Sequence, residues 1–167
     1  MSHSPSLLAH LRDVLILPFT MTVIVPWLIY NPSKLFLIDN VFIDLAGGII
    51  LVVGLSIFAY TVFLFKLLGK GTLAPWQPTQ KLIVAGPYRY CRNPMITGVF
   101  FILIGEAFLF HSLSIIYWSG LFFVINTVYF VLKEEPDLYK RFGDEYARYK
   151  LHVPRWIPRL KPYTHQL

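Results

Sequence analysis

The sequence has little charge and almost no cysteine. Only 14% of its 167 residues are Asp, Glu, Lys or Arg, whereas a soluble domain carries about 25%. The single cysteine, Cys91, excludes an internal disulfide bond. The five histidines are scattered along the chain and show no spacing typical of metal ligands, so no metal site is expected. These absences exclude an ordinary soluble domain and a disulfide-stabilised scaffold.

Apolar residues take the place of charge: 56% of the chain is hydrophobic and 17% is aromatic. Four apolar stretches cover about residues 14–30, 45–68, 94–110 and 113–132. Each stretch is near the ~20 residues that cross a ~30 Å hydrocarbon layer. Only His111 and Ser112 separate the last two, which predicts a tight helical hairpin. The pattern predicts an all-α integral membrane bundle of about four transmembrane helices, forming a single domain over residues 1–167.

Basic residues gather in two regions, the C-terminal tail and the segment between the second and third stretches. That segment contains Lys66, Lys70, Lys81, Arg89 and Arg92, whereas the hairpin contains none. The positive-inside rule then places both termini and this segment in the cytoplasm. The net charge of +6 is therefore interpreted as a topology signal and not as a nucleic-acid site. The single cysteine and the compact size favour a bacterial inner membrane.

The C-terminal tail is predicted to be helical. Leu138, Phe142, Tyr146 and Tyr149 recur at helical spacing, with charged residues between them. Pro136 fits the first turn of a helix, where its missing N–H has no cost. The spacing predicts an amphipathic helix that lies on the membrane interface or folds over the cytoplasmic face of the bundle. Trp156, further on, is typical of an interfacial anchor.

Polar and turn-forming residues crowd the segment GPYRYCRNPMITG, residues 86–98, directly before the third stretch. Asn93 and Pro94 predict a helix N-cap followed by the first helical residue. Free N–H groups at such a helix start can hold a carboxylate or another polar ligand group. Arg89 and Arg92 flank this position. The alternative is an interfacial belt of tyrosine and arginine that only starts the helix.

Carboxylates occupy two unusual positions. Glu134 and Glu135 follow the fourth stretch, where a helix C-terminus would disfavour anions. Their expected partner is a cation, an amine or ribose hydroxyls. The alternative is an ion pair with Arg89, Arg92 or an arginine of the tail. Glu106 lies inside the third stretch, and an ionisable group there indicates function by default. The alternative for Glu106 is a hydrogen bond to Asn126 on the next helix.

Together, GPYRYCRNPMITG and the later EEPDLYKRFGDEYARYKLHVPRWIP resemble the isoprenylcysteine carboxyl methyltransferase and phospholipid methyltransferase superfamily. The superfamily pattern is roughly G-x-Y-x-x-x-R-H-P-x-Y-x-G, a hydrophobic hairpin, E-E, F-G-x-x-Y-x-x-Y and V-x-x-x-x-P. The resemblance spans about residues 80–160, and the first two apolar stretches carry no recognisable motif.

This resemblance implies an integral membrane enzyme that binds S-adenosyl-L-methionine at its cytoplasmic face, between the hairpin and the folded-over tail. Residues 1–68 would form two N-terminal transmembrane helices, and residues 69–167 would form the cofactor-binding catalytic part. Carried over by position, the cofactor-binding residues are Gln80, Lys81, Leu82, Ile83, Tyr88, Asn93, Pro94, Met95, Ile96 and Glu134. The catalytic candidates are Arg92, Glu135 and Glu106, and the lid or substrate residues are Tyr146, Tyr149 and Arg155.

Three positions depart from the superfamily pattern. Asn93 replaces a histidine and cannot act as a titratable base near neutral pH. Ile96 replaces a tyrosine. Phe130 stands where prenylcysteine-specific members place a substrate-binding arginine, so a prenylated protein substrate is not predicted.

The predicted function is methyl transfer from S-adenosyl-L-methionine to a lipophilic substrate, a lipid or isoprenoid-type carboxylate or amine. A membrane reductase of related fold that uses NADPH and a non-catalytic membrane scaffold are the alternatives. The expected partners are this substrate and membrane lipids, without nucleic acid, for a chain that is a monomer or a homodimer.

Overall fold

The computed structural model describes residues 15–32, 41–68 and 81–164. Within these ranges every regular element is helical, which confirms the all-α prediction for the described part of the chain. The elements are η1 (Leu15–Ile24), α2 (Val25–Ile29), α3 (Val41–Leu68), η3 (Gly86–Arg89), α4 (Pro94–Leu109), α5 (Leu113–Tyr129), η4 (Phe130–Glu134) and α6 (Glu135–His152). Of these, η1 and η4 are π-helical and η3 is a 3-10 turn.

Two helices are long and apolar enough to cross a membrane, namely α3 and the continuous helix Leu113–His152. The second has 40 residues and would measure about 60 Å if straight, roughly twice a hydrocarbon layer, so only its first half suits a span. The segments Pro18–Ile29 and Pro94–Leu109 are apolar but shorter. The two long helices are those expected of a membrane protein. The number of four transmembrane helices stays a prediction.

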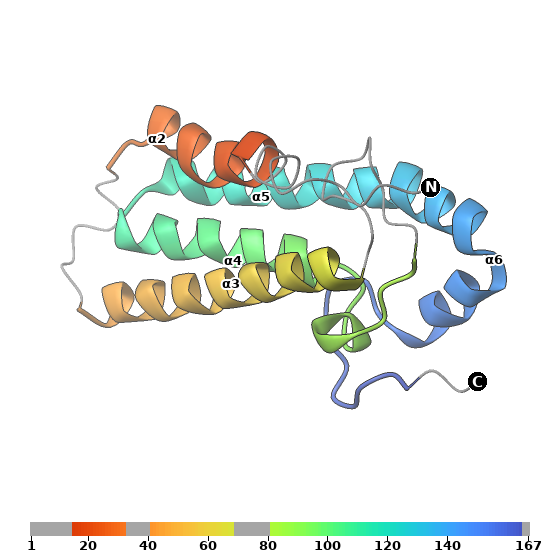
Figure 1. The fold of residues 1–167 in the computed structure, drawn as a ribbon. Coiled ribbons are helices and arrows are strands. Elements are labelled where there is room, and N and C mark those ends of the chain that lie inside the picture. The colour runs from red at the N-terminus through yellow and green to blue at the C-terminus, as the bar shows by residue number, and fades with distance from the viewer. Residues whose placement is uncertain (1–14, 33–40, 69–80, 165–167) are drawn as a thin grey trace.

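Helix α4 lies at the centre of the bundle, with α3 on one side and α5 on the other (Figure 1). Helix α2 packs along α5, and η1 contacts α4. The indole Nε1 of Trp118 donates a hydrogen bond to the Met21 carbonyl at 3.0 Å, which ties η1 to α5.

Glycines allow α3 and α4 to approach each other closely. A Cβ atom added to Gly54 would lie 2.7 Å from the backbone nitrogen of Ile102, and one added to Gly105 would lie 2.7 Å from the α3 backbone. Gly47 is also in close contact with α4, whereas Gly48 has nothing within 4 Å of its would-be Cβ. Small residues at helix contacts are typical of membrane bundles, where packing drives association.

The turn between α4 and α5 forms the predicted hairpin. His111 there has φ +49°, and its Nε2 lies 2.8 Å from Oδ1 of Asp44 near the start of α3. The hydroxyl of Ser112 donates to the Asn31 carbonyl at 3.1 Å, just after α2. These two contacts fasten the N-terminal helices to the hairpin end of the bundle.

The helix that begins with α5 does not end where the apolar stretch ends. Glu134 and Glu135 both have helical backbone angles, and the Glu135 N–H donates to the Phe130 carbonyl five residues earlier. Pro136 accounts for this local π-turn, because proline lacks an N–H and its ring crowds the carbonyl four residues before it. The prediction that Glu134 and Glu135 lie at a helix C-terminus is therefore wrong.

Gly143 reverses the direction of the tail. Its φ of +51° and ψ of −129° interrupt α6 in the middle, and such angles are nearly confined to glycine. The second half of α6 turns back toward the bundle (Figure 1). The predicted tail helix is present over Glu135–His152, although with this break, and the chain after it returns to the start of α4.

Candidate active site

Backbone hydrogen bonds hold the C-terminal tail against the segment that leads into α4. They join the Arg92 N–H to the Pro154 carbonyl (2.9 Å), the Asn93 N–H to Arg155 (3.3 Å), the Arg159 N–H to Tyr90 (3.0 Å) and the Tyr163 N–H to Arg89 (2.9 Å). The N–H groups of Arg92 and Asn93 are therefore paired with protein and not free for a ligand. Asn93 is the N-cap residue and Pro94 starts the helix, as predicted, although the Asn93 side chain makes no capping hydrogen bond.

Glu135 is the centre of an ion-pair cluster between α4, α6 and the tail. Its Oε1 accepts hydrogen bonds from Arg92 Nη1 at 2.9 Å and Arg155 Nε at 2.7 Å, and its Oε2 lies 2.8 Å from Lys150 Nζ. Arg92 also donates to the Tyr146 hydroxyl at 3.2 Å. The Glu135 and Arg92 side chains are only 6% and 10% exposed. For Glu135 the alternative, an ion pair with Arg92 or a tail arginine, is confirmed with both Arg92 and Arg155.

This cluster keeps Glu135 ionised. Burial alone would raise the pKa of Glu135, but hydrogen bonds from Arg155 and Lys150 and the charge of Arg92 lower the pKa to about 2. A carboxylate with so low a pKa is a poor proton acceptor near neutral pH. Its geometry instead suits the attachment of the tail to the start of α4.

Glu134 does not join the cluster around Glu135. Its ion pair is with Arg141, at 4.0 Å, and its side chain is 30% exposed. Burial raises the pKa of Glu134 above its usual range. The two adjacent carboxylates therefore differ in environment, and Glu134 keeps more capacity to bind another group.

The tail tyrosines pack against the loop before α4. Tyr146, Tyr149 and the neighbouring Val153 form a buried cluster, with Leu82 packed against it. The Tyr149 hydroxyl donates to the Tyr88 carbonyl at 2.6 Å. Burial raises the pKa of both the Tyr88 and Tyr149 phenols, so both remain protonated hydrogen-bonding groups near neutral pH.

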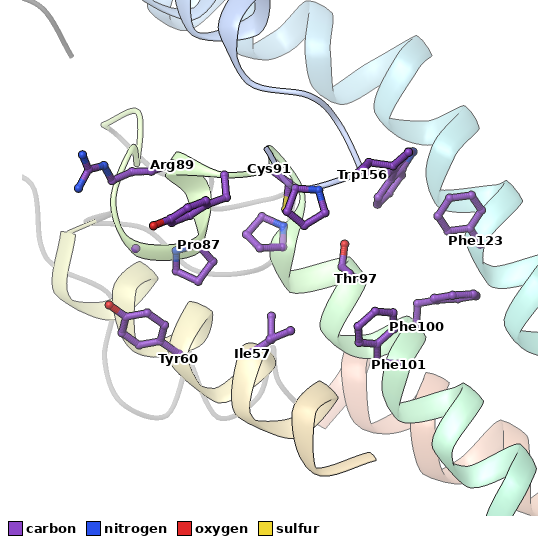
Figure 2. Close-up of a pocket in the computed structure, with 15 residues that line it drawn as sticks. Ile57, Tyr60, Pro87, Arg89, Cys91, Thr97, Phe100, Phe101, Phe123 and Trp156 are labelled. Atoms are coloured by element: carbon purple, nitrogen blue, oxygen red, sulfur yellow. The ribbon is translucent and has the colours of Figure 1, made fainter. Parts of the chain in front are cut away.

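A cavity of about 750 Å³ lies between α3, the start of α4, the segment Gly86–Cys91 and the tail (Figure 2). This volume is within the ~300–1,000 Å³ range of small-molecule sites. Its lining is mainly aromatic and aliphatic, and Arg89 is its one charged residue among those described. Tyr60, Tyr90 and Thr97 add hydroxyl groups.

Aromatic rings form one wall of this cavity. The ring centroids of Phe100 and Phe123 lie 5.3 Å apart, and those of Phe123 and Trp156 lie 4.8 Å apart. Phe130, on η4, meets Trp156 edge-on at 6.0 Å. Figure 2 shows Trp156 reaching from the tail toward Phe123 on α5. Because Trp156–Pro158 also lines the cavity, the folded-back tail completes it.

A family model described as phospholipid methyltransferase matches residues 43–145. The chain belongs to the phospholipid methyltransferase family. This membership confirms the superfamily resemblance, and with the two long apolar helices it makes the chain a membrane methyltransferase. The match begins in α3, a helix in which the sequence shows no recognisable motif. It includes Ile57 and Tyr60, the α3 residues that line the cavity. A search of curated proteins gave no match.

The residues expected to bind the family's cofactor are only partly brought together. Pro94 lines the cavity, and Ile83 packs with Tyr88 in a second buried cluster. Ile96 contacts a different cluster, with Val99 and Phe122. Lys81 is exposed and Met95 is half-buried. Gln80 lies outside the described residues.

Glu106 lies far from the other catalytic candidates. It is twelve residues after Pro94 on α4, or roughly 18 Å along the helix. Its Oε2 is buried and has no hydrogen-bond partner in the described part of the chain. Asn126 donates instead to the Phe122 carbonyl of its own helix at 2.8 Å. The alternative for Glu106, a hydrogen bond to Asn126, is therefore wrong, because Glu106 lies near the hairpin and Asn126 lies toward the opposite end of the bundle.

The sequence did not indicate several residues that define this site. Lys150 is one of three cations on Glu135, yet it is one of many basic residues in the tail. Phe100 and Phe123 line the cavity, but an aromatic residue in an apolar helix gives no signal of its own. Trp156 was predicted as an interfacial anchor, and it stands in the cavity wall.

Proposed function

We propose that this protein is an integral membrane methyltransferase that uses S-adenosyl-L-methionine and acts on a lipophilic substrate. The observation that carries the proposal is the apolar cavity. It is built on the Gly86–Cys91 segment and Pro94, which lie within the part of the chain that matches the family. An acyl or isoprenoid chain would lie against Phe100 and Phe101.

The chemistry of the residues present fits S-adenosyl-L-methionine. This cofactor carries a carboxylate, an ammonium group and ribose hydroxyls, and when bound it supplies a methyl group activated on a sulfonium. The Asn93 amide makes no capping bond, and Arg89 uses its Nε for the Tyr163 carbonyl, which leaves its terminal nitrogens. We assign Asn93 and Arg89 to the carboxylate and Glu134 to the ammonium or hydroxyl groups. Arg92 is held by Glu135 and is assigned to the tail.

The protein would act mainly by positioning and by excluding water. Correct orientation of two reactants can supply roughly 7–11 kcal/mol of barrier lowering. The aromatic wall and Pro158 would keep the reacting groups dry. The cavity lining contains no carboxylate or imidazole among the described residues. A carboxylate acceptor, which is ionised at neutral pH, needs no such base, whereas an ammonium group must first lose a proton.

The same arrangement supports a cytoplasmic active site. The start of α4, α6 and the tail gather at one end of the bundle (Figure 1), and this end carries most of the basic residues. By the positive-inside rule this end would face the cytoplasm, where a polar cofactor is available.

The proposal is tested with the purified full chain in lipid nanodiscs. We expect saturable binding of S-adenosyl-L-methionine and transfer of its labelled methyl group to a lipid or isoprenoid acceptor supplied in the mixture. Asn93→Ala and Glu134→Ala should each weaken cofactor binding about tenfold or more, because each variant loses a charged or buried hydrogen bond to the cofactor. Asp144→Ala, at an exposed position of α6, is the control.

Two outcomes would contradict the proposal. Saturable binding of NADPH without binding of S-adenosyl-L-methionine would indicate a membrane reductase. Binding of neither would indicate a scaffold.

A further inference from the structure

Three of the most exposed aliphatic side chains lie outside the apolar stretches. Leu151, Ile157 and Leu160 are 81%, 80% and 99% exposed. All three belong to the end of α6 and the tail after it. Side chains of this kind that face water singly are ordinary, but three within ten residues of a polar tail indicate a surface that binds a partner.

The charge around these three residues is of one sign. Residues 148–167 contain five Lys or Arg and no Asp or Glu. Lys150 and Arg155 are paired with Glu135. Arg148, Arg159 and Lys161 take part in no ion pair within the described residues. The surface therefore combines exposed aliphatic groups with three positive charges that no carboxylate in the described part of the chain neutralises.

One hydrogen bond brings the two parts of this surface together, and the cavity lining shows where the surface lies on the bundle. The Arg159 guanidinium donates to the His152 carbonyl at 2.9 Å, which brings the tail around Leu160 back to the end of α6. Ile157 also lines the apolar cavity beside α4 and α5. The surface is therefore continuous with the part of the bundle where apolar helices meet the polar end of the molecule, the level of a membrane interface.

We propose that this tail patch, made of Leu151, Ile157 and Leu160 with Arg148, Arg159 and Lys161, docks onto an anionic lipid surface. The aliphatic side chains enter the boundary between headgroups and acyl chains, and the three cations bind the lipid phosphates. A protein partner with an acidic, apolar face is the competing occupant. The membrane is favoured because the patch adjoins the level at which the apolar helices of the bundle give way to its polar, basic end. The inference does not depend on methyl transfer.

The test places a probe on the patch in the full chain. Leu160→Cys is labelled with a polarity-sensitive fluorophore. Cys91 should not react, because it is 3% exposed and burial raises its pKa to about 11. The protein is inserted into nanodiscs of phosphatidylcholine alone or mixed with phosphatidylglycerol. Lys140→Cys, at an exposed position on the first half of α6, carries the same label as the matched control.

We expect the Leu160 probe to report an apolar environment, and to be quenched by spin-labelled lipids, only when phosphatidylglycerol is present. The double variant Arg148→Gln with Lys161→Gln should lower the ratio of membrane-inserted to water-exposed Leu160 probe by about fivefold for each charge removed. High salt should have the same effect. The Lys140 probe should not respond to the lipid.

Equal probe signals in the two lipids would overturn the role of the anionic surface. A water-like Leu160 signal in both would overturn the docking itself, and would leave a protein partner as the occupant. A response of the Lys140 probe equal to that of Leu160 would overturn the assignment to this patch. None of these signals depends on cofactor or activity, so they separate this inference from the proposed function.

Discussion

The Arg92 guanidinium and the Glu135 carboxylate are 43 residues apart in the sequence and 2.9 Å apart in space. This contact joins the start of α4 to the helix that carries the tail. Since the tail supplies Trp156 to the cavity wall, we expect loss of this ion pair to change the shape of the cavity.

Replacing Glu135 with Gln should destabilise the protein strongly. Arg92 is 10% exposed, and a buried charge left without its partner typically costs about 3–5 kcal/mol. Glu134→Gln, one residue earlier and partly exposed, is the matched control and should change the free energy of unfolding by less than about 1 kcal/mol. Unfolding of both variants in detergent, followed by tryptophan fluorescence, measures the difference. Equal effects would show that the cluster does not hold the tail.

Acid should release the tail through Glu135. The pKa of Glu135 is lowered from 4.5 to about 2 by folding, so its contribution to stability is present above the unfolded pKa and is lost as pH falls from 4.5 toward 2. Protease sensitivity of the tail should therefore rise in this window. Glu135→Gln should remove the part of the pH dependence that belongs to this group. An unchanged profile in Glu135→Gln would contradict the assignment.

Gly54→Ala should disturb the contact between α3 and α4. The new methyl group would meet the Ile102 nitrogen at 2.7 Å, and such overpacking costs about 1–3 kcal/mol. Gly48→Ala is the control, because its methyl group would meet nothing within 4 Å. Thermal unfolding in detergent should show a lower midpoint for Gly54→Ala alone. A similar midpoint for both variants would mean that the helices can separate without cost.

Filling the cavity should block the substrate without blocking the cofactor. Ile57→Trp places a larger ring in the cavity lining, and the lost volume should weaken substrate binding about tenfold. Leu55→Trp makes the same change at an exposed position on the same helix and should have little effect. Michaelis constants for the lipid and binding constants for S-adenosyl-L-methionine measure the two effects separately. Equal losses in both variants would remove the cavity from substrate binding.

Local sequence signals predicted much of the fold. Proline at the first helical position set the start of α4, and two residues between apolar stretches set the hairpin. The same signals failed at Glu134 and Glu135, because a change from apolar to charged residues marks where an apolar stretch ends and not where a helix ends. The helix continues through Pro136 by widening into a π-turn.

The sequence by itself determined the helical class, the membrane character and the family, since each follows from composition or from residues close together in the chain. Only the tertiary structure decided that Glu135 binds the tail, that Glu106 lies apart and that Phe123 and Trp156 share one cavity wall. These relationships join residues tens of positions apart. They depend on how Gly143 turns the tail back and on how closely glycines let α3 approach α4, and neither effect has a periodic signature in the chain.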